Sequence, residues 1–179
     1  PYILPKVRKG LRMGHNQIKD HMFLDGLEDA YDEGKLMGSF AEDTAEHYQF
    51  SREEQDNFSI ESLQKAKKAN DEGLFVNEIV NISLQTKIGT KVIDKDEQPY
   101  KANIEKIPSL KPAFGKNGTV TAANSSSISD GAATVILMKE SMAEKKGIRP
   151  LAKIVAHTTN SHEPNWFTTA PIGAISKVL

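Results

Sequence analysis

Apolar residues in the first part of the chain recur at roughly helical spacing, which predicts helices that each bury one face. The first of these covers residues 17–31, where Met22 and Leu27 lie on the apolar side and Gly26 weakens the helix. Residues 1–16 mix proline, glycine and basic residues, so we expect a loop there.

Two capping boxes predict where the next helices begin. In each box a serine lies three residues before a glutamate, so that the two side chains satisfy free backbone N–H groups at a helix start. The boxes at Ser39–Glu42 and Ser51–Glu54 predict helices over about 40–50 and 52–72, and Gly73 is a suitable residue just past the second. The side chains expected to face inward from the second helix are Phe58, Leu63 and Ala66.

The rest of the chain alternates between strand-like and helical patterns. β-Branched runs predict strands over 75–85 and 88–94, and residues 94–118 are turn-rich and expected to be irregular. Further strands are expected at 133–138 and 151–157, with a short helix at 140–146 between them. A last helix begins near Pro171, so the pattern predicts an α-rich insertion followed by part of an α/β layer.

Composition narrows the functional class. Hydrophobic residues make up 38% of the 179 residues and charged residues 26%, as in globular chains. The net charge of −1 gives no global basic field for a nucleic acid, and no apolar run is long enough to cross a bilayer. Cysteine is absent, so these residues contain no disulfide, cysteine-ligated metal or cysteine nucleophile.

The small-residue run 119–132 is the strongest candidate for a binding segment, because small side chains let an extended ligand approach the backbone. The same composition also describes a turn-rich connection, which the residues alone favour, and no phosphate-loop Gly-Lys-Ser/Thr follows it. His157, His162 and Glu163 fit no standard metal-ligand spacing. Residue types alone therefore predict an α/β chain without an identifiable active site.

Longer segments carry more information. The most specific are MG-x-x-AE at 37–42, SREEQD at 51–56, and GTVTAAN followed by DGAA at 118–133. Supporting segments are RKGLRMGH at 8–15, DGLEDAY at 25–31, GIRPLAKI at 147–154 and EPNWFTTAPIGAISKVL at 163–179. In this order and spacing they resemble the thiolase family over nearly the whole chain.

A thiolase consists of two similar α/β halves, with a lid domain inserted in the first. The resemblance implies an α/β, thiolase-like fold fragment in which residues 1–128 form the α-rich lid. Residues 129–149 would form the closing strand and helix of the first half, and 150–179 the start of the second. These residues would amount to about half of a family member.

The family transfers acyl groups between acyl-CoA thioesters through a cysteine thiolate. Because this chain has no cysteine, the resemblance implies that the nucleophile lies outside it and that these residues contain no catalytic residue. The resemblance also implies no metal, and no cofactor beyond the coenzyme A thioester substrate. The CoA-binding positions that the resemblance implies are Ser126, Ala122, Ser125 and Ser127 along the pantetheine arm, Ala113, Phe114 and Leu27 in the lid, Met37 at the acyl group, Phe167 near the pantetheine end, and Lys101 or its neighbour Tyr100 at the nucleotide.

Two departures bear on specificity. Leu36 replaces the histidine of many short-chain members, and Ser127 replaces the usual glycine, so neither acetoacetyl-CoA specificity nor tight pantetheine binding is implied.

Two functional hypotheses follow. The first is a section of an acetyl-CoA acetyltransferase or related thiolase, inactive by itself; the chain starts without Met and stops within a predicted helix, which favours it. The alternative is a thiolase-derived module for CoA binding or oligomerisation without catalysis. We expect acyl-CoA as substrate, no nucleic-acid or membrane partner, a homodimer or homotetramer, and a cytoplasmic location.

Overall fold

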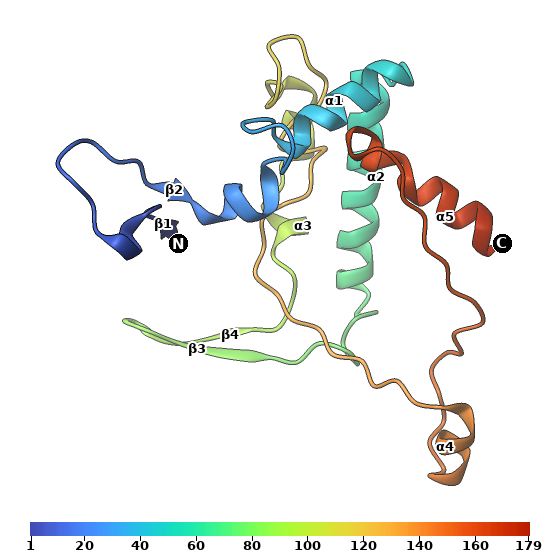
Figure 1. The fold of residues 1–179 in the computed structure, drawn as a ribbon. Coiled ribbons are helices and arrows are strands. Elements are labelled where there is room, and N and C mark those ends of the chain that lie inside the picture. The colour runs from blue at the N-terminus through green and yellow to red at the C-terminus, as the bar shows by residue number, and fades with distance from the viewer. The chain divides into compact units, whose positions relative to one another are not determined.

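Two helices form the frame of Pro1–Ser126, the first of two units into which the chain divides. The computed structural model describes all residues, 1–179 (Figure 1). Helix α1 spans Met37–His47 and α2 spans Arg52–Asp71. The other elements of this unit are β1 (Tyr2–Ile3), η1 (Val7–Lys9), β2 (Lys19–Asp20), η2 (Phe23–Leu27), β3 (Ile82–Thr86), β4 (Gly89–Ile93), α3 (Gln98–Lys101) and η3 (Ile104–Ser109).

Local chemistry fixes both ends of α2. The predicted capping box is confirmed: Ser51 Oγ accepts from the Glu54 backbone N–H at 3.2 Å, and Glu54 Oε2 accepts from the Ser51 N–H at 2.8 Å. At the other end Gly73 has φ 71°. Its N–H donates to Asn70, and the next N–H donates to Ala69, which is the Schellman arrangement expected for a glycine stop.

The antiparallel strands β3 and β4 form a hairpin (Figure 1). Ile82 pairs with Ile93, and Thr86 pairs with Gly89 across a two-residue turn. The predicted second strand is confirmed, whereas only the last part of the first, 75–85, is extended. Residues 94–118 contain the short α3 and η3 and are otherwise irregular, much as expected.

The core of this unit is small and lies where α1, η3 and the run after residue 118 meet. Its buried apolar side chains are Phe40, Ala45, Ile107 and Val120. The buried polar residues are Asp56 and Thr121, and both belong to the hydrogen-bond network described below. The core therefore stabilises the same segment that the sequence singled out as a binding run.

The second unit, Ser127–Leu179, contains three helical elements and no strand. They are α4 (Glu140–Lys145), η4 (Pro164–Thr169) and α5 (Ala170–Val178). Gly147, with φ 64°, ends α4, and a proline lies in the first turn of α5, both as predicted. The two units divide after Ser126 according to the contacts within the chain. The lid boundary expected at residue 128 stays a prediction.

The predicted helix over 17–31 is much shorter in the structure, because strand and bridge pairing replaces both of its ends. β2 pairs with β1, and Asp20 Oδ1 accepts from the Met22 N–H at 2.9 Å. Only residues 21–27 are helical, and they end in the π-helical turn Phe23–Leu27 before Glu28 forms an antiparallel bridge with Leu36. In α2, Phe58 is also wrong as an inward residue, since 74% of it is exposed.

The predicted strands at 133–138 and 151–157 are wrong for this chain. Val135, Ile136 and Val155 are at least 80% exposed, and the second unit offers neither run a hydrogen-bonding partner. A buried strand depends on neighbouring strands for its backbone hydrogen bonds, so an apolar run alone does not form one.

Candidate functional site

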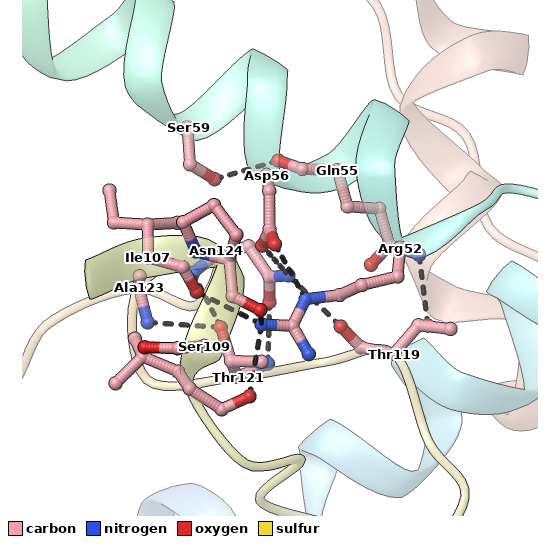
Figure 2. A network of polar contacts seen from close by, with 12 residues as sticks. Arg52, Gln55, Asp56, Ser59, Ile107, Ser109, Thr119, Thr121, Ala123 and Asn124 are labelled. Carbon is pink, nitrogen blue, oxygen red and sulfur yellow. Dashed lines mark hydrogen bonds and ion pairs between the residues drawn. The ribbon is translucent and has the colours of Figure 1, made fainter. Parts of the chain in front are cut away.

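A buried ion pair on α2 lies at the centre of the polar network in Figure 2. Arg52 and Asp56 are four residues apart, so their side chains leave the same face of the helix. Arg52 Nε donates to Asp56 Oδ2 at 2.7 Å, and the Asp56 side chain is only 5% exposed. A short charge-assisted hydrogen bond of this kind is among the stronger ones in proteins.

The same arginine anchors the chain just before two predicted ligand positions. Arg52 Nη2 donates to the carbonyl oxygens of Ile107 and Leu110, each at 3.0 Å. These carbonyls lie at the end of η3 and lead directly to Ala113 and Phe114. The guanidinium therefore ties the segment that carries both candidates to the first turn of α2 (Figure 2).

On its other oxygen, Asp56 holds the small-residue run. Asn124 Nδ2 donates to Asp56 Oδ1 at 3.3 Å and to the Thr119 carbonyl at 3.0 Å, while Asn124 Oδ1 accepts from the Thr121 N–H at 2.6 Å. Each polar atom of the Asn124 amide therefore has a partner. Figure 2 shows this side chain between α2 and the run.

Thr121 closes the run on itself. It is fully buried, and its hydroxyl oxygen accepts from the N–H groups of Ala123 and Asn124 at 3.3 and 3.4 Å. Its carbonyl accepts from Ser125 Oγ at 2.6 Å. Residues 119–125 of the run thus form a hydrogen-bonded loop, and the binding role of the run stays a prediction.

A second carboxylate, Glu42 of α1, holds the beginning of the run. It accepts from the backbone N–H groups of Thr119 and Val120 at 2.8 and 2.9 Å and from Thr119 Oγ1 at 3.1 Å. The capping box predicted at Ser39–Glu42 is therefore wrong: Leu36 is the N-cap, without a side-chain bond, and Glu42 serves this distant segment instead.

Phe114 packs against the backbone of α1. A Cβ atom added to Gly38 would overlap three atoms of the Phe114 ring, so only glycine allows the ring this position. The neighbouring Ala113 N–H donates to the Val120 carbonyl at 2.9 Å. The structure thus joins these two candidates to α1 and to the run that leads to Ser126.

Six further candidates lie on the run, at the start of α1 and in the second unit. Ala122 and Ser126 are exposed on the run, and no hydrogen bond within the chain engages the Ser126 hydroxyl. Met37 is the first residue of α1, and the bridge between Glu28 and Leu36 brings the Leu27 backbone beside it. Ser127 and Phe167 belong to the second unit, where Phe167 lies in η4 and is 43% exposed.

Lys101 lies at the far end of α2 from Asp56. Its ammonium is within 2.7 Å of Glu97, and this hydrogen bond lowers the pKa of that carboxyl. The neighbouring Tyr100 donates to Asp71 at 2.7 Å, which raises the pKa of the tyrosine. Lys95 and Lys67 lie 4.3 and 5.1 Å from the centre of the Tyr100 ring, so two ammonium groups face it.

Other kinds of site find no support in the structure. No group of three histidine, aspartate or glutamate side chains is placed to hold a metal ion. No helix is both long and apolar enough to span a membrane.

Comparison with known proteins decides the family. The model of the thiolase N-terminal domain matches residues 1–141. The chain belongs to the thiolase family. Its fold agrees, since the crystal structure of the acetyl-CoA acetyltransferase of Bacillus anthracis matches the whole chain with a TM-score of 0.93 at 39% identity. The fold class predicted from the sequence, an α/β thiolase fragment, is therefore confirmed.

Relatives in sequence are longer than this chain. A probable acetyl-CoA acetyltransferase of Dictyostelium discoideum is 44% identical over the whole chain, which covers 43% of that protein. An acetyl-CoA acetyltransferase of Saccharomyces cerevisiae is also 44% identical, with 46% of it covered. The chain therefore corresponds to a section of a thiolase, less than half the length of these relatives.

The residues that hold the 119–125 loop have no pattern that indicates a function in the sequence. Glu42, Arg52 and Asp56 looked like ordinary charged positions on helices, and Asn124 like one more polar residue in a turn. The signal that contained them was the set of three motifs MG-x-x-AE, SREEQD and GTVTAAN, which carried the family resemblance without indicating the role of any single residue.

Proposed function

We propose that the polypeptide containing this chain is a thiolase-type acyltransferase, and that residues 1–179 supply part of its acyl-CoA-binding surface. The reaction is the transfer of an acyl group between CoA thioesters through a cysteine thiolate. The chain has no cysteine, so that nucleophile lies elsewhere in the polypeptide.

The observation that carries this proposal is the closed loop at 119–125 that leads to the exposed hydroxyl of Ser126. A loop with its own polar groups satisfied presents fixed atoms to a ligand and loses little further entropy when the ligand binds. In the first unit, Ala122, Ser125 and Ser126 are assigned to the pantetheine arm, Ala113, Phe114 and Leu27 to lid contacts with the ligand, and Met37 to the acyl group.

The length of α2 suits an extended ligand. Asp56, which holds the loop, and Asp71, which accepts from Tyr100, are separated on α2 by about 22 Å at a rise of about 1.5 Å per residue. A thioester arm at one end and an anionic nucleotide at the Lys101 end match this separation.

Ser126→Ala in the complete polypeptide is the direct test. A hydrogen bond made in both ground and transition state lowers KM without raising kcat, so the variant should raise KM for acetyl-CoA about fivefold and leave kcat within about twofold. Ser62→Ala, an exposed serine on α2, is the matched control and should behave as the unmodified protein. An effect of Ser126→Ala on kcat alone would contradict the pantetheine contact.

The catalytic part of the proposal has a separate test. The 179-residue chain alone should show neither thiolysis nor condensation, whereas the complete polypeptide should show both. If the complete polypeptide binds acetyl-CoA but transfers no acyl group, the result would instead support the non-catalytic CoA-binding module. A homodimer or homotetramer and a cytoplasmic location are further proposals, to be tested by sedimentation and by cell fractionation.

A further inference from the structure

Asp56 is the only buried carboxylate of the chain, and each of its oxygens has a different partner. Oδ2 accepts from Arg52, and Oδ1 accepts from Asn124. Burial of a charged group is costly unless it is paired and hydrogen-bonded, and here both conditions are met. The hydrogen bonds from Arg52 and Asn124 therefore stabilise the carboxylate in the interior.

Those two segments are the ones that contain the proposed ligand contacts. Through Arg52, Asp56 is linked to the carbonyls of Ile107 and Leu110, and so to the chain that enters Ala113 and Phe114. Through Asn124, it is linked to the loop that enters Ser126. One side chain thus sets the spacing between the apolar and the hydroxyl-bearing sides of the site.

We propose that Asp56 is a positioning residue for acyl-CoA binding, which fixes the 110–114 and 119–126 segments relative to each other before the ligand arrives. This inference rests on the proposed function. Asp56 does not touch the ligand in this proposal; it acts through Asn124 on one side and through Arg52 on the other.

The negative charge of Asp56 is essential to this role, because both of its partners are donors. In Asp56→Asn the shape is preserved, but one side of the new amide is an NH2 group that faces another donor. Either the Arg52 contact or the Asn124 contact is then lost. We expect KM for acetyl-CoA to rise about tenfold, with kcat changed by less than about twofold.

The experiment uses the complete polypeptide and steady-state kinetics with acetyl-CoA. Asp43→Asn is the matched control, because Asp43 pairs with Lys35 at 2.8 Å on α1 and is 49% exposed. A double-mutant cycle combines Asp56→Asn with Ser126→Ala. If Asp56 acts through the position of Ser126, its replacement raises KM clearly less in the Ser126→Ala background than alone.

A charge-swapped pair provides the rescue. In Asp56→Asn combined with Asn124→Asp, the new amide oxygen faces Arg52 and its NH2 group faces the new carboxylate, so the contact between positions 56 and 124 forms again with reversed roles. The bond from Asn124 to the Thr119 carbonyl is lost, so we expect at least about threefold of the KM effect to be recovered rather than all of it.

The outcomes separate this inference from the proposed function. A normal KM in Asp56→Asn while Ser126→Ala raises KM overturns the positioning role and leaves the proposed function intact; so does full additivity in the cycle. If Ser126→Ala leaves KM unchanged, the pantetheine contact fails. Asp56 is then judged by hydrogen exchange of residues 119–125: unchanged protection there in Asp56→Asn overturns its role, and a rise of about tenfold in the exchange of residues 119–125 supports it.

Discussion

Gly38 gives the sharpest test of how the apolar side of the site is built. It lies in the first turn of α1, and the Phe114 ring occupies the space that a side chain would need. Alanine in place of glycine favours a helix by up to about 1 kcal/mol. Overfilling a packed contact costs about 1–3 kcal/mol, so the two effects oppose each other and the steric one is the larger.

The outcome depends on what moves. The backbone of α1 is held by its helical hydrogen bonds and by Glu42, whereas Phe114 is a half-buried side chain on a loop. The ring should therefore move in Gly38→Ala. We expect a net loss of about 1 kcal/mol in the free energy of unfolding and a rise of about fivefold in KM for acetyl-CoA, because Phe114 no longer lies where the ligand meets it.

Thermal unfolding and steady-state kinetics of the complete polypeptide measure the two effects. Gly26→Ala is the control, since a Cβ atom there meets nothing within 4 Å. Combining Gly38→Ala with Phe114→Leu should relieve the overlap and restore the lost stability. If Gly38→Ala proves more stable than the parent and KM is unchanged, helix propensity outweighs the steric effect and the reasoning about Phe114 is wrong.

Two further predictions concern α2. Arg52→Leu leaves the buried Asp56 without its cation and two carbonyls without their donor. Urea denaturation should therefore show a loss of about 2–3 kcal/mol in the free energy of unfolding, and a smaller loss for Arg52→Lys. An unchanged free energy of unfolding would contradict the assigned network. Hydrogen bonds from the backbone N–H and hydroxyl of Ser51 lower the pKa of Glu54 from its usual 4.5. The cap therefore contributes its full stability above pH 4.5 and loses it as the pH falls through the lowered pKa of Glu54. In pH-dependent unfolding Glu54→Gln should flatten this loss of stability in acid, and an unchanged slope would contradict the contribution of the cap.

Local rules were sufficient where local chemistry decides the structure. The start of α2 at Ser51–Glu54, its stop at Gly73, the end of α4 at Gly147 and the helix at Pro171 all follow from interactions between residues at most five apart. The same rules failed for Glu42, whose capping geometry was available but whose carboxylate is satisfied by N–H groups 77 and 78 residues away. Sequence spacing contains no information about that competition.

Strands failed for a related reason. The apolar runs at 133–138 and 151–157 have strand-like composition, but a strand forms only if another strand completes its hydrogen bonds. The hairpin of β3 and β4 supplies its own partner across a two-residue turn; its second strand was predicted correctly, and its first strand only from residue 82 onward. The difference between these segments is the distance along the chain to the pairing partner.

The motifs that revealed the family have one physical meaning in the structure. MG-x-x-AE places Gly38 against Phe114 and Glu42 against the start of the 119–125 loop. SREEQD places Arg52 against the carbonyls at the end of η3 and Asp56 against Asn124 of the loop. Each of these side chains contacts other parts of the chain, so the motifs show no pattern of reactive groups. Their common effect is to hold backbone segments that would otherwise be independent, so the information in these motifs concerns the shape of the 119–125 loop rather than reactive chemistry.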